Sequence, residues 1–143
     1  MEKKVLATML TRKATDADLS AIEAISRTTR WEKSDYLRRQ LSLGAIDVAV
    51  ENNLVVGFIV TNDEFFSKPF VGLIAVAPAH RRRGVGATLF TMTEARWSGN
   101  QLYTSTNRSN TAMHTLLKGR GYRVIGEIDL DPGDPEIFYR IDL

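Results

Sequence analysis

The sequence contains no cysteine and only two histidines. Without cysteine there can be no disulfide bond, thiolate metal site or cysteine nucleophile, and the absence agrees with a reducing compartment such as the cytoplasm. The two histidines, His80 and His114, are too few for a histidine-built metal site, and no His-Glu-x-x-His motif occurs. We therefore expect no metal.

The sequence also lacks a long hydrophobic run and a large excess of charge of one sign. No apolar stretch approaches the ~20 residues needed to cross a bilayer, and no export signal is visible. Nineteen Lys and Arg residues and seventeen Asp and Glu residues leave a net charge of +2. That balance excludes a polybasic protein, although it allows a local basic patch. We expect a cytoplasmic protein that binds neither membrane nor nucleic acid.

The composition is that of one globular domain. Of the 143 residues, 43% are hydrophobic and 25% are charged, which suits a single core of useful size. No internal repeat, low-complexity tract or linker divides the chain. We therefore expect one domain over residues 1–143.

The periodicity of the apolar residues predicts seven strands and four helices. The order is β-α-α-β-β-β-α-β-α-β-β, which mixes hairpins with crossover helices and predicts a mixed α/β sheet rather than a doubly wound fold or a barrel. The expected strands are Val5–Arg12, Ile46–Glu51, Leu54–Val60, Phe70–Val76, Gln101–Thr106, Val124–Ile128 and Ile137–Ile141. Asn52-Asn53 is expected to turn the chain between the second and third of these strands, which then form a hairpin. The expected helices follow Thr15–Asp18, begin at Ser34, follow the Gly84–Gly86 turn, and cover Ser109–Lys118.

One segment, Val76–Ala87, carries a chemical signal. It places a strand end, three arginines and two glycines directly before a helix. The unpaired N–H groups and positive dipole end of a helix start attract anions, and Gly84 and Gly86 would let a phosphate reach the backbone. Arg81–Arg83 could add charge-assisted hydrogen bonds. The segment predicts a phosphate or pyrophosphate site; alternatively, the glycines only turn the chain and the arginines are solvated.

Two common nucleotide-binding motifs do not fit this segment. A dinucleotide-binding fingerprint would need a third glycine where Leu89 stands. A Walker A loop would need Gly-Lys-Ser or Gly-Lys-Thr, which is absent.

The segment resembles the acyl-CoA signature of the GNAT superfamily, the Gcn5-related N-acetyltransferases. Arg81-x-x-Gly84-x-Gly86 matches Arg/Gln-x-x-Gly-x-Gly/Ala, and it follows a strand that ends Ile74-Ala75-Val76, as in that family. The resemblance continues through Asn110 to the helix end Lys118–Tyr122, and it covers nearly the whole chain.

The resemblance implies a GNAT-like mixed sheet, splayed at an acyl-CoA site, and transfer of an acetyl group from acetyl-CoA to a primary amine of a small molecule or peptide by direct attack. It also implies that backbone amides hold the pyrophosphate and that the pantetheine arm pairs with a strand edge. Asn110 would touch the cofactor, although a helix N-cap is the alternative there. The implied cofactor-binding residues are Ile74, Val76, Arg81, Arg82, Arg83, Gly84, Val85, Gly86, Ala87 and Asn110.

The sequence departs from the family at the expected general acid. The usual tyrosine position is Leu117, and Met113 replaces a customary alanine. Substitute acids, each with a structural alternative as a core or surface residue, would be His114, Tyr103, Tyr122 and Tyr139. No catalytic residue is predicted.

A general base and an acceptor site are equally unassigned. Asp63 and Glu64, in an expected loop, or Glu51 on the hairpin could act through water, or could be solvated carboxylates. Trp31 and Tyr36 could wall the acceptor cleft, or could be core residues. A late acidic run could attract a cationic amine, or could be a polar turn: Glu127, Asp129, Asp131, Asp134 and Glu136.

Two other functions remain as alternatives. Leu117 favours a catalytically silent acyl-CoA-binding module. Nucleic-acid binding through Arg81–Arg83 is less favoured, because the net charge is small and no aromatic residues interleave the arginines. An exposed sheet edge would permit a homodimer.

Overall fold

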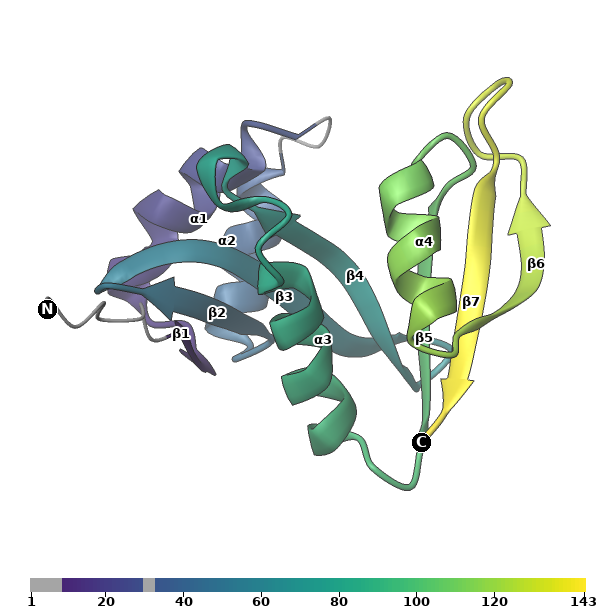
Figure 1. Ribbon diagram of the computed structural model, residues 1–143, viewed down its shortest axis with the longest axis horizontal. Coiled ribbons are helices and arrows are strands. Elements are labelled where there is room, and N and C mark those ends of the chain that lie inside the picture. The colour runs from purple at the N-terminus through teal and green to yellow at the C-terminus, as the bar shows by residue number, and fades with distance from the viewer. Residues whose placement is uncertain (1–8, 30–32) are drawn as a thin grey trace, which may run out of the picture. The chain divides into compact units, whose positions relative to one another are not determined.

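The computed structural model describes residues 9–29 and 33–143 and confirms the predicted order of elements (Figure 1). The helices are α1 Leu19–Ser26, α2 Ser34–Ser42, α3 Val85–Arg96 and α4 Thr111–Gly119. The strands are β1 Met9–Lys13, β2 Ile46–Glu51, β3 Leu54–Phe65, β4 Lys68–Val76, β5 Gln101–Asn107, β6 Arg123–Ile128 and β7 Glu136–Asp142. They follow one another in the sheet as β1-β2-β3-β4-β5-β7-β6. The sheet is mixed, as predicted: β4 and β5 run parallel, while β1–β2, β2–β3, β5–β7 and β6–β7 are antiparallel.

The chain divides into two compact units. The first comprises residues 1–60 and 73–92, and the second comprises residues 61–72 and 93–143. Three elements, β3, β4 and α3, begin in one unit and end in the other. The first part of the expected strand Val5–Arg12 lies outside the described residues.

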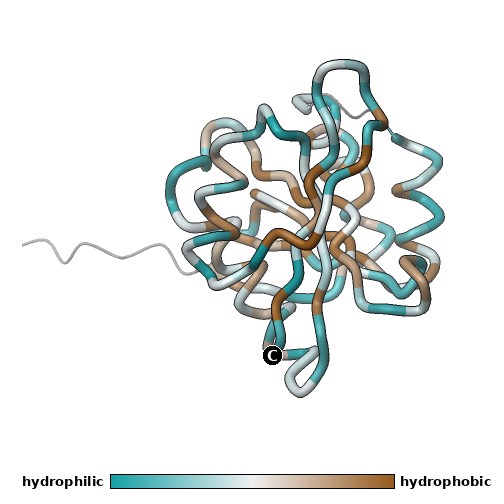
Figure 2. The backbone as a smooth tube through the Cα atoms, turned by 90° about the vertical axis from the view of Figure 1, so that its right-hand side faces the viewer, coloured by the Kyte–Doolittle hydropathy of each residue, from teal (hydrophilic) through white to brown (hydrophobic). Residues whose placement is uncertain are grey.

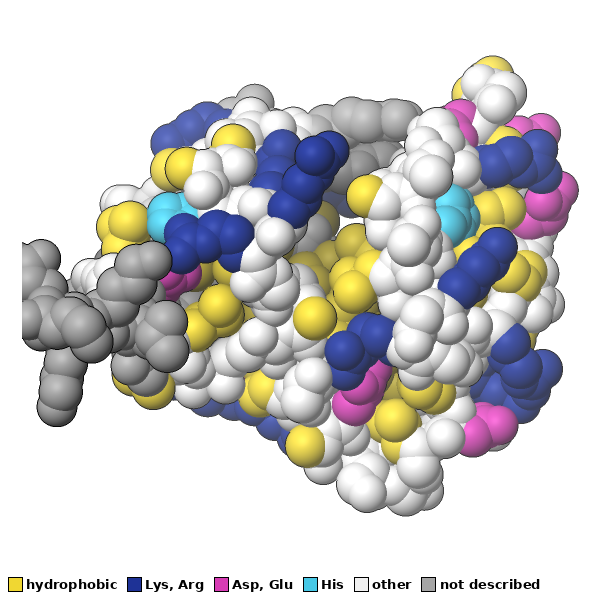
Figure 3. All heavy atoms as spheres, viewed as in Figure 1, with side chains coloured by type: hydrophobic (Ala, Val, Ile, Leu, Met, Phe, Trp, Pro, Cys, Tyr) yellow, Lys and Arg dark blue, Asp and Glu magenta, His cyan; other side chains and the backbone are white. Residues whose placement is uncertain are grey.

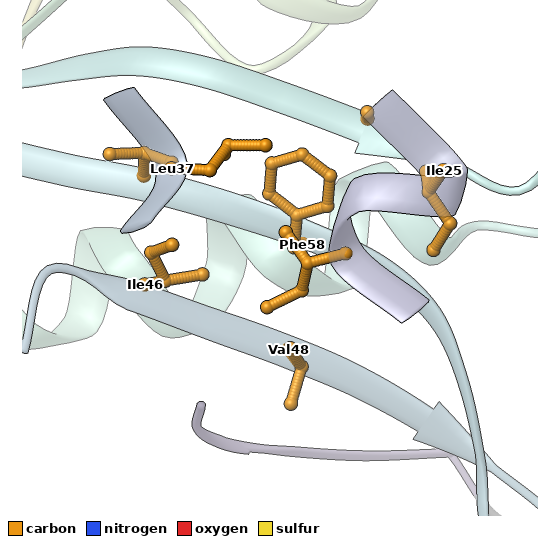
Figure 4. Close-up of a cluster of buried hydrophobic side chains, with 8 residues drawn as sticks. Ile25, Leu37, Ile46, Val48 and Phe58 are labelled. Carbon is orange, nitrogen blue, oxygen red and sulfur yellow. The ribbon is translucent and has the colours of Figure 1, made fainter. Parts of the chain in front are cut away.

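In the first unit, α1 and α2 cover one face of β2 and β3. Ile25 of α1 and Leu37 of α2 point toward Ile46, Val48 and Phe58 of the strands (Figure 4). All five are at most 5% exposed. Burying each such side chain stabilises the fold by about 1.5–3 kcal/mol, so this cluster is the main source of stability in the unit.

The opposite face of β3 carries α3, and Gly57 makes the contact close. A Cβ at Gly57 would lie 2.9 Å from Cγ1 of Val85 and 3.1 Å from the carbonyl oxygen of Ala75. A glycine inside an apolar strand commonly marks such a close approach. The start of α3 is thereby held directly against β3.

Two successive turns of the sheet, between β2 and β3 and between β3 and β4, differ in how well the sequence predicts them. Asn52 and Asn53 adopt positive φ values of 51° and 61° in the expected β2–β3 turn. The prediction that the next strand ends at Val60 is wrong, because β3 continues to Phe65 and turns through Phe66 and Ser67 at φ values of 52° and 58°. Phe66 is not a usual turn residue and a single serine at position 67 is only a weak turn signal, so the sequence does not predict a turn there.

In the second unit, α4 lies on one face of the β5–β7–β6 strands. Tyr139 of β7 points toward α4, and the neighbouring Phe138 points to the other face. There Phe138 stacks on Phe65, with ring centroids 5.6 Å apart, and Phe65 also contacts Phe70 and Tyr103. Figure 2 shows that hydrophobic residues are concentrated along the strands, while the turns are largely hydrophilic. Among the described helices, none combines the length and the hydrophobicity that a bilayer crossing requires.

Candidate functional site

At the end of β4, the backbone edge of Ile74 and Val76 has no strand partner among the described residues, because β4 pairs with β5 only at Phe70 and Val71. The N–H of Ala77 donates to the carbonyl oxygen of Val56 at 2.8 Å, and the carbonyl oxygen of Ala75 also faces β3 at Gly57. Because successive residues of a strand direct their N–H and C=O groups to opposite edges, Ile74 and Val76 direct theirs away from β3. The carbonyl oxygen of Val76 accepts a hydrogen bond from Nε of Arg81 at 3.1 Å, so a side chain rather than a strand serves it. This edge can bind an extended ligand.

The segment Arg81–Ala87, here called the anion loop, follows the end of β4 and includes the first three residues of α3. Its backbone has positive φ at Arg82 (62°) and at Gly84 (80°). A Cβ placed on Gly84 would have nothing within 4 Å, so the space beside this residue is open. A glycine tolerates this conformation, and its missing side chain leaves room for a ligand.

The first turn of α3 adds hydrogen-bond donors to the same place. The N–H of Thr88 donates to the carbonyl oxygen of Gly84 at 3.0 Å, which is the first bond of the helix. The N–H groups of Val85, Gly86 and Ala87 therefore have no acceptor within the helix. Val85 is 1% exposed and anchors the turn against Gly57. Oriented donors at the positive end of a twelve-residue helix can hold a phosphate or pyrophosphate.

The three arginines of the anion loop have different surroundings. Arg81 reaches the Val76 carbonyl and, through a terminal nitrogen, Oγ1 of Thr28 at 3.3 Å. Arg83 forms an ion pair with Glu51 at 2.8 Å. Within the described part of the chain, Arg82 has no hydrogen-bond or ion-pair partner. Figure 3 shows Lys and Arg side chains gathered at the surface over the segment between β4 and α3.

Asn110, predicted to touch the cofactor, belongs to the second unit and caps α4. Its Oδ1 accepts the N–H of Met113 at 3.3 Å, and its Nδ2 donates to Oγ1 of Thr106 at 3.0 Å. The N-cap alternative is confirmed.

Position 117, where a tyrosine would supply the acid, is a core residue: Leu117 is 0% exposed. The three candidate tyrosines are also buried, and each hydroxyl has a partner. Tyr103 donates to Gln101, and Tyr122 donates to Glu94 at 2.8 Å. Burial and the hydrogen bond to Glu94 raise the pKa of Tyr122, and burial raises the pKa of Tyr139. Tyr103, Tyr122 and Tyr139 are therefore core residues, which was the structural alternative for each.

His114 is likewise occupied. Its Nε2 faces the carbonyl oxygens of Asn107 and Arg108 at 3.0 and 3.1 Å, and its Nδ1 lies 2.5 Å from the hydroxyl of Tyr139. Since carbonyl oxygens only accept, we assign the proton to Nε2, and the Tyr139 hydroxyl donates to Nδ1. The side chain ties the β5–α4 connection to α4 and β7.

The candidate bases are not placed as the sequence suggested. Glu51 is 6% exposed and paired with Arg83, so it is not a solvated carboxylate. Asp63 and Glu64 were expected in a loop; they lie in β3. Trp31 lies outside the described residues, and the Tyr36 side chain is partly buried against the core of the first unit.

Most of the late acidic run is used within the second unit. Arg108 pairs with Glu127 at 2.6 Å, Ser109 donates twice to Asp134, Asn107 donates to Asp131, and Ser105 donates to Glu136. These contacts favour the polar-turn alternative over attraction of an amine. Among the described residues, no group of three or more His, Asp or Glu side chains is placed to hold a metal ion.

Comparison with known proteins gives a consistent result for the whole chain. A model of the Acetyltransferase (GNAT) family matches residues 9–122. A GNAT-family acetyltransferase from Bacillus cereus is 28% identical, with a TM-score of 0.84, over 94% of this chain and 97% of that chain. The structure of yncA from Salmonella typhimurium with its cofactor acetyl-CoA is 21% identical, with a TM-score of 0.74, over 94% of each chain. NAA60 of Arabidopsis thaliana, in complex with a bisubstrate analogue, is 18% identical, with a TM-score of 0.78, over 94% of this chain and 97% of that chain. No curated protein matches the sequence.

Proposed function

Because this chain belongs to the GNAT acetyltransferase family, we propose that it is an N-acetyltransferase that transfers the acetyl group of acetyl-CoA to a primary amine of a small molecule or peptide. The proposal covers residues 1–143 as one catalytic domain. The structural neighbour yncA, solved with acetyl-CoA, supports the choice of acyl donor.

The anion loop is the observation that carries the proposal. It combines open space beside Gly84, three N–H donors at the start of α3 and a guanidinium on Arg82 that has no partner among the described residues. A pyrophosphate carries two negative charges within a few ångströms and needs such a set of donors. We propose that Arg81, Arg82, Arg83, Gly84, Val85, Gly86 and Ala87 together form the pyrophosphate site.

The edge of β4 suits the remaining length of the donor. The pantetheine arm contains two amides. The outward N–H and C=O groups of Ile74 and the outward N–H of Val76 can pair with them as a strand would, while the Val76 carbonyl accepts from Arg81. Asn110 belongs to the second unit, where its side chain caps α4, so we base the proposed cofactor site on the residues of the first unit.

The reaction is an amine attack on a thioester. The amine nitrogen forms a bond to the acetyl carbonyl carbon, the carbon–sulfur bond breaks, and the amine proton ends on the CoA thiolate. A thiol with a pKa near ~8.5 is an adequate leaving group in water, so a protein acid is not required. We assign no catalytic residue, because Leu117 cannot donate a proton and the neighbouring hydroxyls are buried and engaged.

The main alternative is an acyl-CoA-binding module without turnover, which the buried Leu117 favours. A screen of primary amines, comprising polyamines, amino sugars, aminoacyl compounds and short peptides, separates the two. We expect at least one amine to release free CoA faster than water does. Binding of acetyl-CoA with no acceleration by any amine would support the silent module.

Two further features belong to the proposal. A cytoplasmic location agrees with the cysteine-free sequence and with the supply of acetyl-CoA there. Nucleic acid is not a proposed partner, because two of the three clustered arginines bind within the protein. A homodimer through a sheet edge would appear as twice the chain mass in light scattering.

A further inference from the structure

Glu51 is a nearly buried carboxylate at the end of β2, and no step of the proposed reaction uses it. Its side chain is 7% exposed, whereas its partner Arg83 is 51% exposed. A carboxylate removed from water must be paired, and Arg83 supplies the pair through a 2.8 Å contact. The pair joins residues 32 positions apart in the sequence.

The β2–β3 hairpin holds the segment from β4 to α3 at two other points. The carbonyl oxygen of Val56 accepts the N–H of Ala77, before the anion loop, and Gly57 lies close to Val85, the first residue of α3. The Glu51–Arg83 pair is the attachment between these two points. All three contacts come from the β2–β3 hairpin, so this hairpin fixes the position of the anion loop.

We propose that Glu51 is a positioning residue for the anion loop. Its ion pair holds Arg83 on the hairpin side, which orders the loop backbone around the phosphates, and leaves Arg82 as the guanidinium that contacts the anion directly. The inference rests on the proposed function, because the anion is taken to be the pyrophosphate of acetyl-CoA.

The sign of one substitution separates this role from simple electrostatics. If Glu51 were only a nearby negative charge, Glu51→Gln would remove a repulsion and tighten the binding of an anion. If Glu51 orders the loop through Arg83, Glu51→Gln weakens binding although the protein becomes more positive.

The experiment compares Glu51→Gln, Arg83→Met and the double variant, with Arg82→Met as the matched control. Arg82→Met and Arg83→Met remove the same charge from neighbouring positions of the same loop. Acetyl-CoA affinity is measured by calorimetry at low and high ionic strength, well below the melting temperature of each variant. Arg83→Lys, which keeps a cation for Glu51, serves as the conservative rescue.

We expect Glu51→Gln and Arg83→Met each to weaken acetyl-CoA binding by about three- to tenfold. The double variant should bind no more weakly than the single variant with the lower affinity, because both changes break the same ion pair. Arg83→Met should also lower the melting temperature, because Glu51 loses its partner. Arg82→Met should weaken binding without a change in melting temperature and should reduce the salt dependence. Arg83→Lys should bind nearly as the wild type does.

Tighter acetyl-CoA binding by Glu51→Gln would overturn the inference. It would also be overturned if Arg83→Met lowered the affinity just as much in the Glu51→Gln background, because Arg83 would then contact the phosphates itself. Both results leave the proposed function intact. If the folded wild-type protein does not bind acetyl-CoA at all, the proposed function fails and the inference fails with it.

Discussion

At the scale of single residues, the Arg12–Asp18 pair shows how local charge contributes to stability. Both terminal nitrogens of Arg12 contact the Asp18 carboxylate, at 2.7 and 3.0 Å, and the N–H of Thr15 donates to it at 2.7 Å. The hydrogen bonds from Arg12, and secondarily that from Thr15, lower the pKa of Asp18 below its ordinary value of 3.8. The folded state therefore favours the ionised carboxylate. The ionised Asp18 therefore stabilises the fold at pH values above the pKa that Asp18 has in the unfolded chain. This stabilisation is lost as the pH falls through the lower pKa of Asp18 in the folded protein.

The first prediction concerns Asp18→Asn. We expect the free energy of unfolding to fall by about 1–2 kcal/mol at pH ~7, because the ion pair and the contact with the Thr15 N–H weaken. The difference from wild type should shrink below pH ~4 and disappear when Asp18 is protonated in both states. Urea unfolding at a series of pH values measures it, and a difference that stays constant across the series would contradict the assignment.

The arginines of the anion loop show what sequence can and cannot predict about a site. Their position before a glycine-rich helix start predicts an anion site from local chemistry alone. Their different contacts depend on Glu51 and Thr28, which are distant in the sequence and come close to the loop only in the folded chain. Nothing in the local sequence distinguishes Arg82 from its neighbours.

At the scale of elements, the contact of β3 with α3 depends on Gly57. Gly57→Ala would push a methyl group to 2.9 Å from Val85 and 3.1 Å from a backbone oxygen, which cannot move aside easily. We expect a loss of about 1–3 kcal/mol in unfolding free energy and weaker acetyl-CoA binding, because the start of α3 shifts.

The matched control for this second prediction is Gly126→Ala, on the exposed strand β6, where an added Cβ would have nothing within 4 Å. Thermal unfolding and calorimetry on both variants make the comparison. Equal stability and equal affinity of the two variants would show that the close approach at Gly57 does not matter.

The third prediction concerns α4, where Leu117→Tyr restores the family's usual residue. Since Leu117 is 0% exposed, the larger ring and its hydroxyl must enter the core, and we expect a loss of about 1–3 kcal/mol with no gain in turnover. Thr115→Tyr, at an exposed position of the same helix, should leave stability nearly unchanged. A Leu117→Tyr protein that is as stable as wild type and turns over faster would place this side chain beside the thioester.

Element boundaries followed the sequence where turn chemistry was explicit. Asn52 and Asn53 predicted their hairpin because asparagine tolerates positive φ. The sequence does not predict the extension of β3 to Phe65, because Thr61–Glu64 resembles a polar loop and Phe66–Ser67 gives only a weak turn signal. Phe65, at the end of the extension, packs against Phe70 and Phe138, both of which come later in the sequence.

At the scale of the whole molecule, the order of elements and the motif before α3 were enough to indicate the family. The catalytic residues could not be predicted, because Leu117 stands where the family usually has its acid. The side chains considered as substitutes are engaged in contacts within the protein. For the acidic run, the sequence offered a polar turn as an alternative but could not identify its partners, because Ser105, Asn107, Arg108 and Ser109 lie on β5 and in the turn after it.

The proposed function depends on acetyl-CoA binding at the anion loop, and calorimetry on the wild type and on Gly84→Glu is its most direct test. Gly84→Ala is the control for backbone strain, because φ at this position is 80° and any L-residue there costs about 1–2 kcal/mol. We predict saturable binding by wild type, retained binding by Gly84→Ala, and a folded Gly84→Glu protein that does not bind, since its carboxylate would enter the open space where the pyrophosphate belongs. Unchanged affinity in folded Gly84→Glu, or no binding by wild type, would contradict the central claim.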